Sequence, residues 1–433
     1  MTTIPFGEAI SVWWRIGVLS FGGPAGQIAL MHRILVEEKG WVDEARFLHA
    51  LNYCMLLPGP EAQQLATYVG WLLHGVRGGL VAGLLFILPG AVAILALSWL
   101  YVLLGDLAVV EGLFFGLKAA VLAIVAQALL RIAGRALQGL LKPLLALAAF
   151  TALFVFSLPF PLVVIGAGLI GYVGARFFSP ADASAAVPLA PVTVRPGTRT
   201  AAITCLLLWL STVGGLVLLL GPDNVFAQIS VFFAKMALIT FGGAYAVLSY
   251  VAQQGVEHYQ WLQPGEMLDG LAMAETTPGP LILVTQFVGF LAGFREGLPQ
   301  PGLLTATAGA LLTLWVTFLP CFVWIFAGAP HVEKLRGHRA LSAALAAITA
   351  AVVGVIANLA LWFALNALFT EQIRVTNHGI DLLLPQLDSL NGPLLAIAVI
   401  ACVLVFVARI GILPLLGLCA GLGVAWTWLA TSL

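Results

Sequence analysis

The chain has 433 residues, of which 61% are hydrophobic and only 9% are charged. Soluble domains carry about a quarter charged residues, so this composition excludes an ordinary soluble protein. Nineteen Lys and Arg residues balance nineteen Asp and Glu residues, which leaves no basic surplus to attract nucleic acid. The five cysteines lie in apolar stretches without a Cys-x-x-Cys pair, so neither a disulfide framework nor a metal site is predicted.

Long apolar segments separated by short polar breaks predict membrane-spanning helices. Most reach the roughly 20 residues that a helix needs to cross the hydrocarbon core, and the alternation typical of a membrane β-barrel is missing. The N-terminus lacks the features of a signal peptide, which predicts insertion through the first helices themselves. In chain order, the clearest spans are residues 78–104, 111–130, 143–158, 160–175, 200–220, 301–329, 341–369, 391–407 and 410–430.

The sequence contains an internal duplication. Ser-Phe-Gly-Gly at 20–23 recurs as Thr-Phe-Gly-Gly at 240–243, an offset of 220 that Trp41 and Trp261 share. Pro-Gly-Pro recurs at the same offset, at residues 58–60 and 278–280. After an eleven-residue insertion near Arg295 the offset becomes 231, so that Pro89 matches Pro320 and Gln127 matches Asn358, and later Pro143 matches Pro393. Such matches in fixed register predict two related halves.

The duplication divides the chain into four parts. We predict a first transporter repeat at 1–177 and a cytoplasmic linker, rich in Pro, Ala and Thr, at 178–199. A connecting transmembrane helix follows at 200–221, and a second repeat occupies 222–433. Because the connecting helix adds one crossing, the two repeats are predicted to have inverted topology.

Positive charge predicts the orientation, because Lys and Arg accumulate on cytoplasmic loops. Basic residues concentrate at 131–142, in the linker and at 331–339, whereas the intervening turns lack them. The basic segment 32–46 and Arg77 both favour the cytoplasmic side, although an apolar stretch separates them. We therefore favour re-entrant hairpins at the Phe-Gly-Gly and Pro-Gly-Pro breaks, which gives nine crossings. The alternative lets these segments cross and gives thirteen.

The Gly/Pro breaks predict an anion site. Pro ends a helix and Gly permits a sharp bend, while broken backbone at membrane depth is tolerated only in a cavity or inside protein. A helix that starts at such a break directs free N–H groups and its positive dipole end at the cavity. Inverted repeats with broken helices near the midplane are a recurrent transporter design. Four breaks around a pseudo-two-fold axis would form a backbone cage for an oxyanion.

Polar side chains flank the breaks and are the candidate substrate ligands. Hydroxyls and amides donate to oxyanion oxygens, although Ser and Thr also cap helices or join them. The candidates with the break glycines are Ser20, Gly22, Gly23, Gln27, Gly59, Gln63, Gln64, Thr240, Gly242, Gly243, Tyr245, Thr276, Thr277 and Gly279.

Four charged residues complete the candidate site. Arg15 and Lys235 occupy equivalent positions five residues before each break, where a cation from each half would suit a dianion. Snorkelling of both side chains to the interface is the alternative. Glu61 and Glu275 are the acids next to the Pro-Gly-Pro breaks and are candidates for proton coupling, although Glu61 also suits a helix N-terminus.

The paired Phe-Gly-Gly and Pro-Gly-Pro motifs resemble the signatures of the chromate ion transporter family, in its long two-domain form. The resemblance covers essentially the whole chain, with Ala244 where the first half has Pro24. It implies a bacterial inner-membrane protein that exports chromate, driven by proton-motive force, and thereby confers chromate resistance. It implies neither an enzyme nor a cofactor.

The motifs leave alternatives open. Sulfate is also a tetrahedral dianion, so it is a possible competitor, and uptake of sulfate or a related oxyanion is the alternative function. A chromate reductase would be expected to carry a nucleotide-binding fingerprint or a metal-ligand cluster. This sequence contains neither, which argues against an enzyme. Protons are the expected coupling ion. The sequence motifs do not define the oligomeric state.

Overall fold

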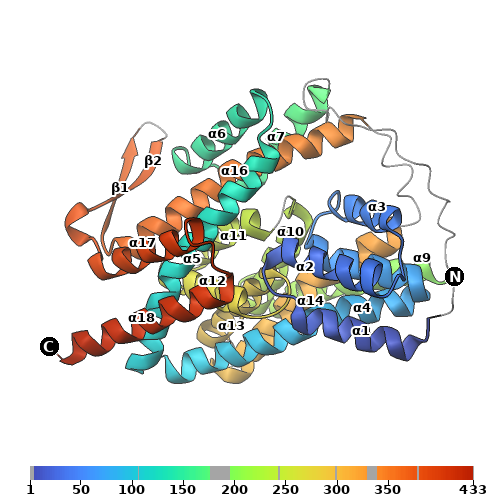
Figure 1. Ribbon diagram of the computed structural model, residues 1–433, viewed down its shortest axis with the longest axis horizontal. Coiled ribbons are helices and arrows are strands. Elements are labelled where there is room, and N and C mark those ends of the chain that lie inside the picture. The colour runs from blue at the N-terminus through green and yellow to red at the C-terminus, as the bar shows by residue number, and fades with distance from the viewer. Residues whose placement is uncertain are drawn as a thin grey trace. The chain divides into compact units, whose positions relative to one another are not determined.

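The computed structural model describes residues 4–105, 107–175, 196–241, 244–297, 300–328, 339–377 and 380–432, and these are almost entirely helical (Figure 1). Most of the predicted linker at 178–199 lies outside this range, as do Gly242 and Gly243. An all-α polytopic membrane protein, as predicted, is confirmed by the helical content and the long apolar helices.

Each predicted span coincides with a helix. Within the described residues, six helices are long and apolar enough to cross a membrane: α4 (Glu61–Leu104), α5 (Ala108–Ala136), α9 (Thr198–Leu220), α14 (Leu303–Gly328), α16 (Arg339–Leu368) and α18 (Ile412–Ser432). Shorter apolar helices occupy the other predicted spans: α6 (Leu141–Phe154), α7 (Phe160–Val173) and α17 (Gly392–Phe406).

Short helices surround the predicted breaks. In the first half they are α1 (Phe6–Leu19), α2 (Gly23–His32) with the π-helical turn η1 (Arg33–Glu38), and α3 (Glu44–Cys54). In the second half they are α10 (Val225–Ile239), α11 (Ala244–Gln253), η2 (Gln254–His258), α12 (Pro264–Thr276), η3 (Leu281–Leu283) and α13 (Val284–Glu296). At 1.5 Å per residue, the 14 residues of α1 cover about 21 Å, less than the hydrocarbon core of about 30 Å.

Helix α4 is a helical hairpin rather than one continuous rod. Its backbone leaves helical geometry at His74 and Gly75, where Gly75 has φ +66° and ψ −153°. A Cβ atom on Gly70 would lie 2.4 Å from the carbonyl oxygen of Gly78, so the two arms touch through backbone. The second arm therefore begins near the start of the predicted span 78–104. Helices α13 and α14 touch in the same way, at Gly289 and Gly309.

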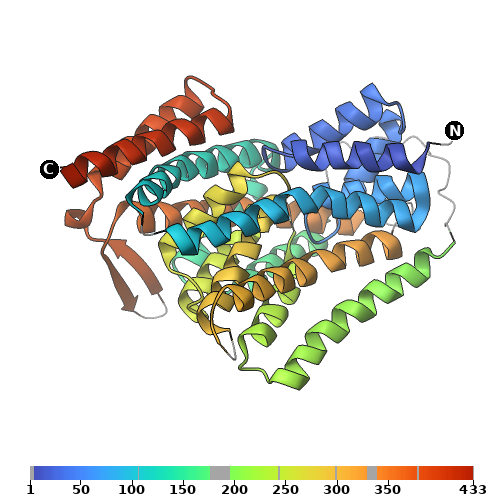
Figure 2. The same cartoon turned by 90° about the horizontal axis from the view of Figure 1, so that it is seen from below.

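The chain forms two compact units, and each draws segments from both halves of the sequence. The first unit contains the described parts of Met1–Ser98, Asp182–Val247 and Thr277–His338. Within it α9 packs along α14 and α10, and Figure 2 shows α9 in green beside α14 in orange.

The second unit contains the described parts of Trp99–Ala181, Leu248–Thr276 and Arg339–Leu433. Helix α16 packs against α5, α6 and α7, and α18 packs along α5. Small residues allow this close packing: a Cβ atom on Gly354 would lie 2.0 Å from the carbonyl oxygen of Ala146.

The second unit also carries an antiparallel hairpin of β1 (Gln372–Asn377) and β2 (Ile380–Pro385), followed by the 3-10 turn η5 (Leu387–Ser389). No strand was predicted in this part of the chain. The hairpin falls where the offset between the halves grows from 231, at Gln127 and Asn358, to 250, at Pro143 and Pro393, an insertion of 250 − 231 = 19 residues. The first half therefore has no counterpart in sequence for it.

Candidate functional site

The Phe-Gly-Gly break of each half pairs with the Pro-Gly-Pro break of the other half. The backbone N–H of Gly279 donates to the carbonyl oxygen of Ser20 at 2.8 Å, and the N–H of Gly59 donates to that of Thr240, also at 2.8 Å. The two bonds are equivalent, because Ser20 and Thr240, and likewise Gly59 and Gly279, are 220 residues apart. All four residues belong to the first compact unit. Each Phe-Gly-Gly break is thus bonded to the Pro-Gly-Pro break of the other half.

Glycine is required at the bends themselves. Gly59 has φ +117° and Gly279 has φ +100°, a region that side-chain-bearing residues rarely adopt. Gly22 (φ +85°) and Gly23 (φ +69°) play the same part at the start of α2. Pro24 in the first turn then fixes the helical φ, and no side chain caps the N-terminus of α2. The N-terminus of α2 therefore keeps N–H groups that no side-chain cap satisfies.

Buried glutamines hold the breaks in place. The side-chain amide of Gln27 donates to the carbonyl oxygen of Gly279 at 2.6 Å, and that of Gln64 donates to Pro58 at 2.7 Å. The amide of Gln63 donates to the hydroxyl of Thr67 at 3.1 Å. In this conformation each of these amides donates at least one hydrogen bond to the protein, while among the described residues the side-chain oxygens of all three glutamines are buried without a hydrogen-bond partner. The bonds of Gln27 and Gln64 position the breaks.

The hydroxyls beside the breaks bond mainly to their own helices. Ser20 and Thr240, which are equivalent, donate to the carbonyl oxygens one turn earlier, of Ile16 and Met236, at 2.6 and 2.7 Å. Thr276 likewise donates within α12. Two further candidates, Thr277 and Tyr245, are buried and half-buried respectively.

The basic pair lies at the surface. Arg15 is 47% exposed and forms an ion pair with Glu38 at 3.0 Å, and Lys235 on α10 is exposed as well. The structure therefore does not bring Arg15 and Lys235 into the crossed pairing of the breaks. Their exposure agrees with the snorkelling alternative.

The two predicted acids have different surroundings. Glu61 is the first residue of α4, directly after Pro-Gly-Pro, and is half-buried. Glu275 is buried in the last turn of α12 and belongs to the second unit.

Asp269 is a second buried acid, and it was not among the predicted site residues. Its carboxylate accepts a hydrogen bond from the hydroxyl of Tyr101 at 3.0 Å and pairs with Lys118 at 3.3 Å. The other carboxylate oxygen is buried and has no hydrogen-bond partner in the part of the chain that the structure describes. A sequence signal existed, since Lys118 interrupts the predicted span 111–130 and a charge inside a span needs a partner.

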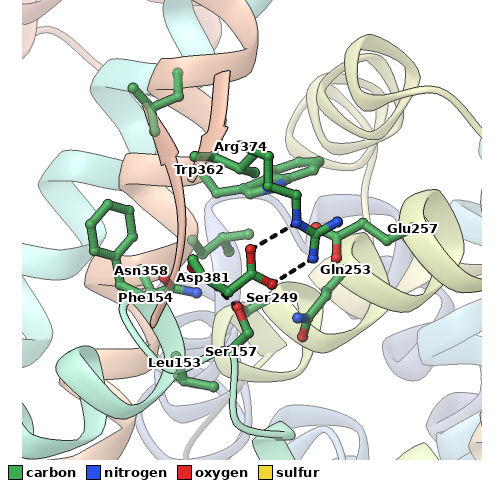
Figure 3. Close-up of a pocket in the computed structure, with 13 residues that line it drawn as sticks. Leu153, Phe154, Ser157, Ser249, Gln253, Glu257, Asn358, Trp362, Arg374 and Asp381 are labelled. Atoms are coloured by element: carbon green, nitrogen blue, oxygen red, sulfur yellow. Dashed lines mark hydrogen bonds and ion pairs between the residues drawn. The ribbon is translucent and has the colours of Figure 1, made fainter. Parts of the chain in front are cut away.

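A small polar pocket lies beneath the β-hairpin in the second unit (Figure 3). Its volume is about 60 Å³, and it combines polar residues of α11 with Asn358 of α16. Across the hairpin, Arg374 donates two hydrogen bonds to the carboxylate of Asp381, at 2.7 and 2.5 Å. The guanidinium of Arg374 lowers the pKa of Asp381, so the pair remains ionised. Glu257 lies at the pocket beside Arg374 in Figure 3.

Comparison with known proteins identifies the family. The model of a family described as "Chromate transporter" matches residues 7–172 and again residues 227–424, which correspond closely to the two predicted halves. A chromate transport protein of Cupriavidus metallidurans is 30% identical over 81% of this chain and 80% of its own length. One from Pseudomonas aeruginosa is 33% identical over 79% of this chain and 77% of its own length.

A probable chromate transport protein of Synechococcus elongatus is 30% identical over 79% of this chain and 80% of its own length. No solved structure matches the chain. The matches cover both halves, and the long apolar helices agree with a multi-pass membrane protein. The chain therefore belongs to the chromate transporter family, a family of transporters rather than of enzymes.

Proposed function

We propose that this protein exports chromate from the cytoplasm, with the anion held by backbone N–H groups at the broken helices between the two repeats. The crossed backbone pairing of the breaks supports this proposal above all other observations. It places the uncapped start of α2 next to the Pro-Gly-Pro of the second half, through the bond of Gly279 to Ser20. A helix N-terminus binds a tetrahedral oxyanion without needing a nearby cation. This suits a site whose basic residues, Arg15 and Lys235, are exposed.

The direction of transport has an electrostatic argument. A charge that crosses a membrane potential of 100 mV gains or loses about 2.3 kcal/mol. A dianion that leaves an inside-negative cell therefore gains about 4–5 kcal/mol, which import would have to overcome. Export is the favoured direction for chromate and for any other dianion.

Coupling to protons is the second part of the proposal. Glu61 and Glu275 are the proposed carriers, because a carboxylate beside an anion site is repulsive unless it is protonated. Asp269 is a further buried carboxylate, and it pairs with Lys118 at 3.3 Å.

The test is uptake of chromate into everted membrane vesicles that contain the protein. Uptake is measured with and without a proton gradient, and with excess sulfate as competitor. Vesicles without the protein give the background. We expect energised accumulation of chromate that sulfate suppresses.

The other outcomes are equally informative. Accumulation of chromate that does not depend on the proton gradient would contradict proton coupling. It would still support export of chromate driven by the membrane potential. No accumulation, with the protein shown to be in the membrane, would contradict chromate export and favour sulfate uptake, which right-side-out vesicles would then reveal.

A further inference from the structure

A large apolar groove lies in the first compact unit, between the second arm of α4, the first turns of α9 and helix α14. Its volume is about 1,120 Å³, and its walls are side chains such as Leu84, Leu88, Leu208, Leu314 and Phe318. This volume exceeds what most small-molecule pockets offer. A cavity of this size and polarity does not hold ordered water, because water needs two to four polar partners.

The groove exists because α9 stands partly away from its neighbours. Among the six long apolar helices, α9 is the least buried. Three indole N–H groups hold it: Trp71 donates to the hydroxyl of Thr198 at 3.0 Å, Trp209 donates to the carbonyl oxygen of Val316 at 2.9 Å, and Trp315 donates to the hydroxyl of Thr212 at 3.1 Å. Between these anchors, α9 faces the groove with Thr204, Cys205 and Leu208.

One end of the groove is cationic. Arg77, at the start of the second arm of α4, lines this end together with Pro196 and Gly197, which precede α9. Arg77 is exposed, and within the described part of the chain it has no ion-pair partner. Its turn is the one that the distribution of positive charge assigns to the cytoplasmic side.

The length of the groove matches one leaflet of a bilayer. From Arg77 to Ala91, the last groove residue on α4, there are 14 helical steps of 1.5 Å, or about 21 Å. One leaflet, with its headgroup region included, is about 20–22 Å deep, half of the roughly 40–45 Å of the whole bilayer. A lipid whose phosphate pairs with Arg77 would therefore lay an acyl chain along the apolar wall.

We propose that this groove binds one anionic phospholipid of the cytoplasmic leaflet, with its phosphate at Arg77 and an acyl chain between α4, α9 and α14. Charge complementarity selects an anionic headgroup, because a zwitterionic lipid presents an ammonium group next to its phosphate. The groove also lies directly behind the breaks: Ala91 lines it, and the carbonyl oxygen of Ala91 accepts a hydrogen bond from Gln286 at 3.0 Å.

The experiment measures lipid retention on the purified full-length protein by native mass spectrometry. Phosphatidylglycerol and phosphatidylcholine with identical chains are titrated separately into delipidated protein. We expect one phosphatidylglycerol per chain to be retained at concentrations where phosphatidylcholine is not. Arg77→Gln should weaken retention about fivefold, the equivalent of about 1 kcal/mol per basic residue near a membrane surface.

Two further variants separate the groove from the surface. Leu84→Trp places a bulky ring on an exposed wall position, leaves Arg77 in place and should abolish retention. Arg131→Gln, at an exposed arginine of α5 on the same predicted side of the membrane, should retain the lipid as the unchanged protein does.

Equal retention of both lipids, no retention of either, or wild-type retention in Leu84→Trp or Arg77→Gln would each overturn the proposal. Unchanged thermal unfolding of the variants would show that they are folded. Because no chromate is present, the result does not depend on the proposed transport activity.

Discussion

Gly59 and Gly279 are the residues on which the candidate site depends most directly. Each has a positive φ, and each donates its N–H to the opposite break. Both are also tightly packed: a Cβ atom on Gly59 would lie 3.0 Å from the sulfur of Cys321, and one on Gly279 would lie 2.9 Å from Leu283. Backbone strain and crowding therefore act together at these two positions.

We predict that Gly59→Leu and Gly279→Leu each lower chromate transport more than tenfold while the protein still reaches the membrane. A non-glycine residue in this backbone region costs of order 1–3 kcal/mol, and the added side chain displaces neighbours that hold the breaks. Transport into everted vesicles and the amount of protein in the membrane are measured together.

Gly214→Leu is the matched control for these variants, because Gly214 lies within α9 and a Cβ atom there would meet nothing within 4 Å. It should transport at the unchanged rate. Full transport by both Gly59→Leu and Gly279→Leu would show that the breaks are not part of the substrate pathway.

The repeat-related prolines shape two transmembrane helices. Pro320 lies inside α14 and has no N–H, so it leaves the carbonyl oxygen of Val316, four residues earlier, without its helical partner. The indole of Trp209 on α9 donates to that oxygen at 2.9 Å. Pro89 similarly frees the carbonyl of Leu85, against which Gly17 of α1 packs closely. Each proline thus creates a contact point for a neighbouring helix.

We predict that Trp209→Phe lowers the free energy of unfolding by about 1–3 kcal/mol, because it leaves a buried carbonyl group without a hydrogen bond. Thermal unfolding in detergent measures the change. Trp315→Phe is the control on the same pair of helices, since Trp315 is 43% exposed and donates to the half-buried hydroxyl of Thr212. An equal loss in both variants would show that ring packing, rather than the bond to Val316, holds α9.

The spans and the positions of the breaks were predictable because each has a local cause. Apolar length predicts a spanning helix, and Gly or Pro ends one, so α1 ends before Gly22 and α3 ends before Pro58. The partner of each break was not predictable, because the bond from Gly279 to Ser20 joins residues far apart in the sequence. Likewise, the residues around Gln27 in the sequence do not show whether its amide bonds to the protein, as it does to Gly279, or faces a cavity.

The β-hairpin was missed although the sequence contains a signal for it. Asn-His-Gly at 377–379 is a turn-forming sequence between two short runs rich in Ile, Val and Leu. Each run is only 6 residues long and lies between two long apolar segments, so the apolar pattern was interpreted as helices alone. The pairing of Arg374 with Asp381 depends on the register of the hairpin, which places Arg374 opposite Leu383, two residues from Asp381.

At the scale of the whole molecule, the prediction that the repeats are inverted is the one with the widest consequences. Asp43, at the start of α3, and Gln263, at the start of α12, are equivalent under the offset of 220, and both are exposed. In an inverted protein they lie on opposite sides of the membrane. With nine crossings, Asp43 is cytoplasmic and Gln263 external, whereas thirteen crossings exchange the two sides.

We predict that a membrane-impermeant thiol reagent added to intact cells labels Gln263→Cys and leaves Asp43→Cys unlabelled, and that everted vesicles give the reverse. The basic residues Arg33, Lys39 and Arg46 hold the first loop in the cytoplasm, whereas 254–266 contains no Lys or Arg. The unsubstituted protein supplies the background, because four of its five cysteines are buried. Labelling of Asp43→Cys alone in intact cells would select thirteen crossings. Labelling of both from one side would contradict inversion, and with it a site built from the crossed breaks of two oppositely oriented repeats.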